Sequence, residues 1–269
     1  EPLVRKDIGS LFQELGRRIR QGGVQGSENG LNELVLTSNG TQLDKYAEAL
    51  VDWGVRRINV SLDTLDRAVF HQLTRRDKLT QTLAGIEAAQ KAGLQVKINT
   101  VVLKNYNKDE LPRLIDWAHE RNMDITLIET MPLGFVDEDR YNQYVPLLPL
   151  QDHLVNQLAL QPSSYRSGGP AVYFTRPGSA RRVGFISPLT NNFCSGCNRV
   201  RVTCTGKIYT CLGQDSKIDL RPALKAQDAA ALNALLDVAL TVKPKGHEFS
   251  ITRDDPTPAT ERHMSVTGG

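Results

Sequence analysis

Three cysteines near the C-terminal end of the sequence have the spacing of metal ligands. Cys194 and Cys197 form a Cys-x-x-Cys pair, and thirteen residues separate Cys197 from Cys211. Two intervening residues make a turn tight enough for two thiolates to face one metal, and a third thiolate can complete a site that keeps one coordination position open. The pattern therefore favours an iron–sulfur cluster with one uncommitted iron.

Two other interpretations of the cysteines stay open on spacing alone. One is a structural zinc site, although such sites normally take four ligands. The remaining cysteine, Cys204, alternates with Val200 and Val202, so we predict that it lies on the apolar face of a strand as a small buried hydrophobe. A disulfide is the least favoured interpretation, because four cysteines in 269 residues are sparse.

Two arginines lie in the same run as the cysteines. Arg199 and Arg201 alternate with apolar residues, and in an extended strand this alternation places both guanidinium groups on one face. A guanidinium group binds phosphate oxygens through paired hydrogen bonds. A metal site flanked by these cations therefore suits an anionic ligand that carries phosphates.

Composition and charge exclude several classes of protein. The chain has 269 residues, enough for one or two domains, with 40% hydrophobic and 23% charged residues, an ordinary globular balance. No apolar run approaches the roughly 20 residues that a membrane-spanning helix needs. The net charge is only +3, which is too small for a protein that coats nucleic acid. We therefore predict neither a membrane nor a nucleic-acid partner.

Segments with helical periodicity alternate with strand-like segments in the first half of the chain. Strands that alternate with helices form parallel βαβ units, so we predict an α/β fold built as an open or closed barrel. The predicted strands are 31–36, 55–62, 94–103 and 125–130, and the main predicted helices are 6–21, 43–51, 78–92 and 109–121.

The pattern changes after residue 135. Short strands surround the cysteines, and an alanine- and leucine-rich helix follows them. These strands are predicted at 172–175, 182–186, 199–204 and 207–211, and the helix at 220–242. We therefore predict two domains, a partial α/β barrel over residues 1–135 and a smaller domain with the cysteine site over residues 136–269.

Residues at the C-terminal ends of the strands are the first candidates for function in such folds. This rule singles out four residues, each of which also has a structural explanation as a turn former, a helix cap or part of the core: Thr37, Ser61, Asp63 and Met131. Lys97 differs, because it lies inside an otherwise apolar strand. On the inward face of a barrel it would need an anionic partner, whereas on the outward face it would be a solvated charge.

Several motifs, in this order along the chain, resemble the GTP 3′,8-cyclases of molybdenum-cofactor biosynthesis, a family of radical S-adenosylmethionine enzymes. They are EPLVRKDI, LTSNG, INVSLDTLD, VKINTVVLK, IETMP, FCSGCNRVRVT and the terminal Gly268-Gly269. The resemblance implies an incomplete radical SAM barrel with a smaller domain that binds a cluster and GTP. It also implies a lyase that converts GTP to (8S)-3′,8-cyclo-7,8-dihydroguanosine 5′-triphosphate, through a 5′-deoxyadenosyl radical that abstracts the ribose 3′ hydrogen.

The resemblance assigns roles to particular residues. By it, Cys194, Cys197 and Cys211 hold a [4Fe–4S] cluster whose open iron binds the guanine of GTP. Ser61 and Met131 match positions that contact S-adenosylmethionine, and the terminal Gly268 and Gly269 reach into the active site as catalytic residues. The residues that match GTP contacts are Thr37, Lys97, Arg199, Val200 and Arg201.

The sequence departs from the family in two places. The family's first cluster is held by a Cys-x-x-x-Cys-x-x-Cys motif that has no counterpart in this sequence. We therefore expect the chain to be the C-terminal portion of a longer enzyme that carries a second [4Fe–4S] cluster, and we expect this portion alone to generate no radical. In addition, Thr126 stands where the family usually has an arginine, which removes one cation expected near the substrate.

Three rival functions remain at this point, one of which is an inactive nucleotide-binding remnant. A structural zinc-binding α/β protein would account for the cysteines but not for the arginines, Lys97 or the terminal glycines. A radical SAM enzyme that uses an auxiliary cluster on another substrate would share the barrel but would not be expected to end in Gly-Gly. The resemblance further implies GTP as partner, a downstream cyclic pyranopterin monophosphate synthase and a cytoplasmic location, and it leaves a homodimer open.

Overall fold

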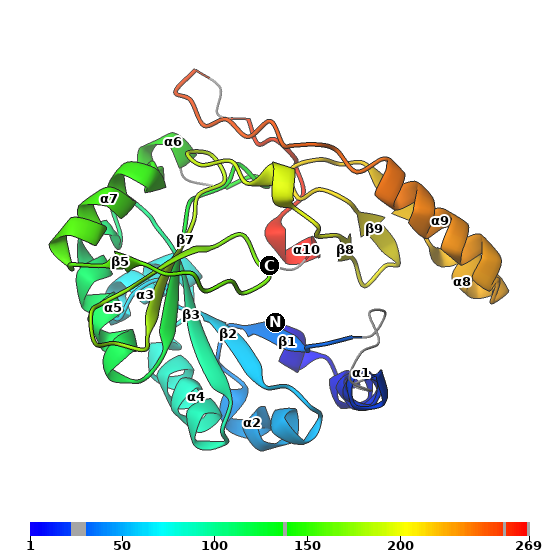
Figure 1. The fold of residues 1–269 in the computed structure, drawn as a ribbon, viewed down its shortest axis with the longest axis horizontal. Coiled ribbons are helices and arrows are strands. Elements are labelled where there is room, and N and C mark those ends of the chain that lie inside the picture. Colours follow the sequence, from blue (N-terminus) through cyan, green and yellow to red (C-terminus); the bar gives the residue numbers. More distant parts are fainter. Residues whose placement is uncertain (23–30, 137–138, 255–256, 268–269) are drawn as a thin grey trace. The chain divides into compact units, whose positions relative to one another are not determined.

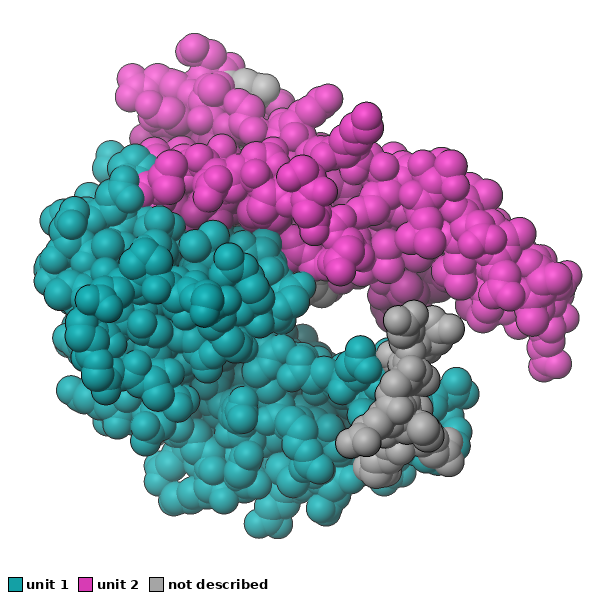
Figure 2. All heavy atoms as spheres, viewed as in Figure 1, with its two compact units in different colours: residues 1–128, 149–186 teal, residues 129–148, 187–269 magenta. Residues whose placement is uncertain are grey.

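The computed structural model describes residues 1–22, 31–136, 139–254 and 257–267. Gly268 and Gly269 lie outside the described residues. The chain divides into two compact units, coloured separately in Figure 2. Unit 1 comprises Glu1–Ile128 and Pro149–Ile186, and unit 2 comprises Glu129–Leu148 and Ser187–Gly269.

This division differs from the single boundary predicted between residues 135 and 136. Residues 149–186 belong to unit 1 because they supply three strands to its sheet. One of them, β7 (Arg182–Ile186), pairs in parallel with β4 (Asp124–Ile128). The assignment of cluster and GTP binding to residues 136–269 stays a prediction.

Within the described residues, unit 1 contains a seven-stranded sheet in the order β1-β2-β3-β4-β7-β6-β5. Strands β1 to β4 and β7 run parallel to one another, β6 pairs antiparallel with β7, and β5 pairs antiparallel with β6. The remaining strands are β1 (Val35–Ser38), β2 (Arg57–Ser61), β3 (Gln95–Val101), β6 (Val172–Thr175) and β5 (Gln161–Pro162). In the part of the chain that the structure describes, the edge strands β1 and β5 do not pair with each other, and the predicted α/β fold of the incomplete-barrel type is confirmed.

Helices cover one face of this sheet (Figure 1). That face is apolar, because alternate strand residues such as Ile58, Ile98 and Leu127 are fully buried. The helices of unit 1 are α1 (Ile8–Gly22), α2 (Leu43–Asp52), α3 (Arg67–Thr74), α4 (Leu79–Lys91), α5 (Leu111–Glu120) and most of α7 (Leu147–Gln157), with the short turns η1 (Pro2–Val4) and η2 (Lys108–Glu110). Gly54 and Gly93 end α2 and α4 with φ angles of 91° and 90°, a left-handed conformation that favours glycine.

Unit 2 contains a small antiparallel sheet, whose described strands follow the order β10-β9-β8. Ile208, Leu220 and Ala239 form its hydrophobic core. Its elements are α6 (Arg140–Gln143), η3 (Cys194–Gly196), β8 (Arg201–Val202), β9 (Lys207–Tyr209), β10 (Lys217–Asp219), α8 (Arg221–Ala226), α9 (Ala229–Thr241) and α10 (Met264–Thr267). No helix in the described part of the chain is long and apolar enough to cross a membrane.

The single helix predicted over residues 220–242 is wrong, because the structure breaks it into α8 and α9. Gln227 adopts a left-handed conformation with φ 53°, which ends α8. Asp228 then caps α9 by accepting a hydrogen bond from the Ala231 N–H at 2.9 Å. The apolar composition concealed this local capping signal.

The predicted burial of Cys204 is also wrong. Strand β8 ends at Val202, and a turn closes the hairpin through a 3.0 Å hydrogen bond from the Gly206 N–H to the Thr203 carbonyl. The strand alternation therefore stops before Cys204, which is exposed. Val200 and Val202 are 40% and 58% exposed, so this face of the strand is not core.

A buried carboxylate organises the chain of unit 2 directly after β4. Glu129 is fully buried and accepts hydrogen bonds from the backbone N–H groups of Leu147, Leu189 and Thr190 at 3.0, 2.7 and 3.0 Å. The hydroxyls of Tyr144 and Thr190 also donate to it, at 3.1 and 2.8 Å. One side chain thereby fixes two segments that lie far from it in the sequence.

Candidate functional site

The face of the unit 1 sheet opposite the helices is polar, and it holds three of the predicted site residues. Strand register aligns Thr37, Asn59, Lys97 and Asp124 in one row across β1 to β4. The next row contains Ser61, Asn99, Thr126 and Gly184. The structure thus brings Thr37, Ser61 and Lys97 onto one face of neighbouring strands. The predicted strand 31–36 begins and ends later than expected, so that Thr37 lies inside β1.

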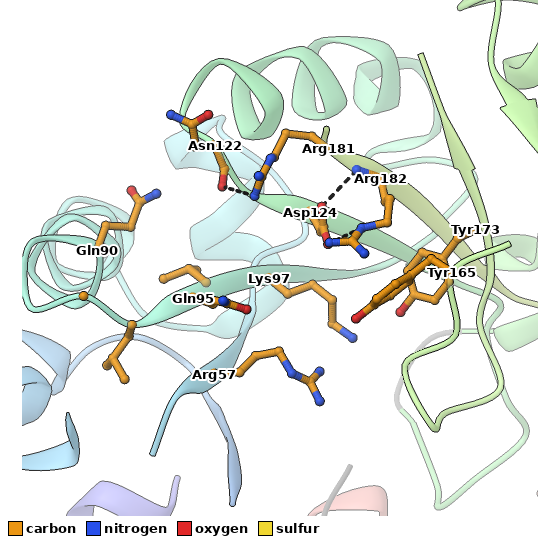
Figure 3. A pocket seen from close by; sticks show the side chains of 13 residues that line it. Arg57, Gln90, Gln95, Lys97, Asn122, Asp124, Tyr165, Tyr173, Arg181 and Arg182 are labelled. Atoms are coloured by element: carbon orange, nitrogen blue, oxygen red, sulfur yellow. Dashed lines mark hydrogen bonds and ion pairs between the residues drawn. The ribbon is translucent and has the colours of Figure 1, made fainter. Parts of the chain in front are cut away.

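Lys97 points into a cavity of about 250 Å³ on this face (Figure 3). Its side chain is directed toward the rings of Tyr165 and Tyr173, and Arg57 reaches into the same cavity from β2. Burial, followed by the nearby charge of Arg57, lowers the pKa of Lys97 to about 8. Lys97 therefore lies on the inward, half-buried side of its strand and is not a solvated surface charge.

The other cations of this cavity already have partners. Arg57 Nη2 lies 2.7 Å from Glu33 Oε2, and Arg182 Nε lies 3.0 Å from Asp124 Oδ2. The guanidinium of Arg182 also stacks 3.6 Å from the ring centroid of Tyr165. Among the described residues, the ammonium of Lys97 has neither a hydrogen bond nor an ion pair. Lys97 is thus the cation available to an anionic ligand.

Other polar groups on this face also lack partners. In the described part of the chain, the buried atoms Asn59 Oδ1, Asn99 Oδ1 and Thr126 Oγ1 have no hydrogen-bond partner. Thr126, which stands where an arginine was expected, is completely buried. Buried polar atoms in folded proteins are nearly always satisfied. The face is therefore suited to a polar ligand that supplies the missing hydrogen bonds.

Ser61, the last residue of β2, borders a second cavity of unit 1. This cavity has a volume of about 480 Å³ and lies at the C-terminal ends of β1 and β2, with Asn39, Asp63 and Gln81 among its lining residues. Asp63 accepts a hydrogen bond from the Val101 N–H at 2.8 Å. Burial raises the pKa of Asp63 from an ordinary 3.8 to about 6, so the carboxylate is costly at neutral pH.

We expect Asp63→Asn to stabilise the protein at pH 7.5 by about 1–3 kcal/mol. The raised pKa means that the folded state binds this proton more tightly than the unfolded state does. The resulting stability is fully present below pH 3.8 and is lost as the pH rises through about 6. Asparagine keeps an acceptor for Val101 but carries no charge. Urea unfolding of both proteins between pH 4 and 8 tests this, and parallel stability curves would contradict it.

Met131 lies in unit 2, in the irregular segment that follows β4. It is half-buried, and its carbonyl accepts a hydrogen bond from the Leu133 N–H at 2.9 Å. Its predicted contact with S-adenosylmethionine stays a prediction, as does that of Ser61.

The cysteine site lies within unit 2. Cys194 and Cys197 occupy the turn η3, in which the Cys197 N–H donates to the Cys194 carbonyl at 3.0 Å. Cys211 follows β9, and all three thiols are half-buried. Lys243 connects the two cysteine segments, because its Nζ lies 3.9 Å from Cys197 Sγ and 2.6 Å from the Thr210 carbonyl oxygen.

Cations favour the thiolate form of Cys197. Burial alone would raise the pKa of this thiol, but hydrogen bonds from the backbone and side chain of Arg199, with the charges of Arg199 and Lys243, lower the pKa below its ordinary value. Arg199 Nη2 lies 3.7 Å from Cys197 Sγ. Burial lowers the pKa of Arg201, while the nearby thiols of Cys197 and Cys211 act in the opposite direction. The predicted arginines and cysteines therefore share one electrostatic environment.

The thiols are not assembled as a metal site in this structure. Among the residues described, no group of three His, Cys, Asp or Glu side chains is arranged to hold a metal ion. The donor chemistry nevertheless fits an iron–sulfur cluster, since three cysteines surrounded by cations can supply thiolates. We infer that Cys194, Cys197 and Cys211 are the residues that would hold such a cluster.

Sequence analysis missed several residues that shape these sites. Lys243 was not singled out, because a lysine near a helix C-terminus has an ordinary structural role. Arg57 and Glu129 showed no local pattern that distinguished them from surface charges. Each of these residues shapes its site through hydrogen bonds or ion pairs with residues that are distant in the sequence.

Comparison with known proteins identifies the class first. Residues 1–118 match the model of the Radical SAM superfamily, and residues 123–249 match that of Molybdenum Cofactor Synthesis C. Together with the parallel βα sheet, these matches define a radical SAM protein. A GTP 3′,8-cyclase of Sinorhizobium medicae (strain WSM419) is 55% identical over 270 aligned residues, covering all of this chain and 75% of that relative. The chain belongs to the GTP 3′,8-cyclase family.

A second curated relative supports the same family. A GTP 3′,8-cyclase of Erythrobacter litoralis (strain HTCC2594) is 52% identical, covering all of this chain and 79% of that relative. The crystal structure of Streptococcus suis SuiB bound to S-adenosylmethionine aligns with a TM-score of 0.49 at 13% identity, covering 96% of this chain and 70% of that one. That structural likeness is too low to carry an argument. Family membership removes the structural-zinc alternative and the alternative of a radical enzyme with another substrate.

Proposed function

We propose that this chain forms the substrate-binding part of a GTP 3′,8-cyclase, a lyase that rearranges GTP to (8S)-3′,8-cyclo-7,8-dihydroguanosine 5′-triphosphate. The observation that carries the proposal is the half-buried ammonium of Lys97, which has no partner among the described residues and lies in one row with Thr37. A buried cation of this kind needs an anion to offset its desolvation. The phosphates of GTP supply one.

The residues of this chain would bind and orient the nucleotide. Within unit 1, Lys97 and Thr37 are the proposed GTP contacts. Within unit 2, the proposed GTP contacts are Arg199, Val200 and Arg201. Cys194, Cys197 and Cys211 would hold a [4Fe–4S] cluster whose open iron binds the guanine. Rigid orientation of the substrate is what radical chemistry requires, because a reactive intermediate must meet only one atom.

The remaining proposed roles concern the generation of the radical and the completion of the active site. When bound, S-adenosylmethionine and the second [4Fe–4S] cluster expected in the full-length enzyme supply a 5′-deoxyadenosyl radical. Ser61, at the edge of the 480 Å³ cavity, and Met131 would contact S-adenosylmethionine. Gly268 and Gly269, outside the described residues, would complete the active site as catalytic residues. We propose further that the enzyme works in the cytoplasm and passes its product toward a cyclic pyranopterin monophosphate synthase, and a homodimer stays a prediction.

The proposal is tested by anaerobic turnover of the full-length enzyme with GTP, S-adenosylmethionine and a strong reductant. We expect 5′-deoxyadenosine and the cyclised nucleotide to form together, with guanosine a poor substrate because it lacks the phosphates. Formation of 5′-deoxyadenosine without any cyclised nucleotide, whichever nucleoside triphosphate is added, would contradict the proposal.

Arg201→Ala and Lys97→Met should each weaken GTP binding by about 10- to 100-fold, since each removes charge-assisted hydrogen bonds to phosphate. Isothermal titration with GTP and with guanosine measures this, and guanosine binding should hardly change. Arg18→Ala is the matched control, because Arg18 is exposed and forms an ion pair with Glu14 on α1. Equal losses for GTP and guanosine would show that the two cations support the fold and do not bind phosphate.

A further inference from the structure

The C-terminal segment of unit 2 is held by backbone hydrogen bonds. The Ala259 N–H donates to the Pro132 carbonyl at 2.9 Å, and the Gly134 N–H donates to the Thr260 carbonyl at 2.9 Å. Leu133 and Thr260 form a parallel bridge. The ends of protein chains fray unless something ties them down. Residues 259–267 are therefore anchored beside the segment that follows Met131.

Arg262 provides a second anchor. Its side chain is only 7% exposed, and its Nη1 lies 2.7 Å from Asp215 Oδ1. Its Nη2 donates to the carbonyls of Leu212 and Gln214 at 2.7 and 3.1 Å. The guanidinium stacks 4.1 Å from the ring centroid of Tyr209. Burying an arginine is costly unless it is fully paired, and here every one of these polar contacts goes to the loop that follows Cys211.

The neighbours of Arg262 reinforce this anchor. The Thr260 hydroxyl also donates to Asp215, and it accepts a hydrogen bond from the Arg262 N–H at 3.2 Å. His263 packs so closely on Gly134 that a Cβ atom there would lie 2.4 Å from its Nδ1. Gly134 also has φ +64°, so both space and backbone conformation favour glycine. We call Arg262, Asp215 and Thr260 the Arg262 clamp.

We infer that Arg262 is a positioning residue of the cyclase. The Arg262 clamp fixes the segment 259–267 to the loop after Cys211, and in the sequence this segment directly precedes Gly268 and Gly269, the proposed catalytic residues. The inference rests on the proposed function, because it assigns the terminal glycines to the active site. It adds that residues 259–267 and the loop after the third cysteine are held in register by the buried guanidinium of Arg262, which pairs with the more exposed Asp215.

A positioning role differs from a purely structural one in its kinetic consequence. If the clamp only stabilised the fold, its loss would lower the formation of 5′-deoxyadenosine and of cyclised nucleotide in parallel. If it positions the tail, S-adenosylmethionine is still cleaved while the nucleotide radical is no longer directed to product. The amount of cyclised nucleotide per 5′-deoxyadenosine therefore distinguishes the two roles.

The test compares Arg262→Gln with Arg253→Gln in the full-length enzyme. Arg253 is the matched control, since it is an exposed arginine of the same C-terminal region that stacks 5.3 Å from the ring centroid of Tyr141. In Arg262→Gln we expect amide hydrogen exchange at Gly134 and Ala259 to accelerate about tenfold or more, and product per 5′-deoxyadenosine to fall by a similar factor. Arg253→Gln should leave both values near those of the wild type.

Graded variants sharpen the test. Arg262→Lys keeps the charge that faces Asp215 but cannot reach both carbonyls, so it should restore part of the product yield. The double variant Asp215→Asn, Arg262→Gln should give the same product yield per 5′-deoxyadenosine as Arg262→Gln alone, because both substitutions remove the same ion pair. If Arg262→Gln does not fold, Asp215→Asn carries the same comparison, since Asp215 is 61% exposed.

The outcomes separate this inference from the function on which it rests. Wild-type enzyme that forms cyclised nucleotide, with unchanged exchange and product ratio in Arg262→Gln, overturns the positioning role and leaves the cyclase function standing. A parallel fall of both products also overturns it. Wild-type enzyme that forms no cyclised nucleotide refutes the proposed function and, with it, the role of the clamp in that reaction.

Discussion

Serine at Cys194, Cys197 or Cys211 is expected to remove one cluster's iron, and its share of the brown absorbance, from the anaerobically purified full-length enzyme. Iron–sulfur clusters are held by thiolates, and a hydroxyl is a poor replacement ligand. The cationic surroundings of Cys197 lower its pKa and make it a ready ligand. Iron and sulfide analysis with visible absorption spectroscopy measures the loss.

Cys204→Ser is the control for this prediction. Cys204 is exposed in the hairpin turn after β8, so its replacement should leave iron and absorbance unchanged. Because thiolates bound to iron are poor nucleophiles, cluster loading should also slow the alkylation of the three predicted ligands, but not that of Cys204. Loss of iron in Cys204→Ser as complete as in the others would show that the ligand assignment is wrong.

Glu129→Ala should produce the largest change in stability, a loss of about 3–5 kcal/mol in the free energy of unfolding. The carboxylate is fully buried and accepts five hydrogen bonds, three of them from backbone N–H groups. Alanine would leave these donors buried without an acceptor. Urea unfolding followed by circular dichroism measures the effect.

Glu129→Gln and Glu87→Ala are the matched variants. Glutamine keeps one acceptor oxygen but turns an NH2 group toward backbone donors, so an intermediate loss is expected. Glu87 is an exposed glutamate that pairs with Lys91 along α4, and its removal should hardly change stability. Should Glu129→Ala cost no more than Glu87→Ala, the network around Glu129 would not be what fixes residues 144–147 and 189–190.

The sequence by itself determined the local elements and the family. Helical and strand periodicity placed β3 within 94–103, where the structure has Gln95–Val101, and the stop signals at Gly54 and Gly93 coincide with left-handed turns. These signals are local, because periodicity and turn chemistry act within a few residues. The motifs around Cys194 and Cys197 carried the family resemblance, which comparison with curated relatives confirms.

Local signals failed where composition concealed a break. The alanine- and leucine-rich composition of residues 220–242 predicts one helix, but Asp228 caps the N-terminus of α9 and so separates it from α8. Cys204 reads as a strand residue, but the turn to Gly206 exposes it. In both places one capping or turn residue determined the local structure, although the composition of the surrounding residues predicted a continuous element.

Only the tertiary structure showed which charged residues form buried networks and which one, among the described residues, stays unpaired in the cavity of unit 1. Glu129 is bonded to partners 15 to 61 residues away, Arg262 to an aspartate 47 residues away, and Lys97 is distinguished by the ion pairs that occupy Arg57 and Arg182. The local sequence does not predict these partners, because a charged residue has the same sequence context whether it is solvated or buried in a hydrogen-bond network. Burial and pairing arise only when distant segments pack together. They distinguish these few residues from the other charged residues of the chain, which has 33 Lys and Arg and 30 Asp and Glu residues.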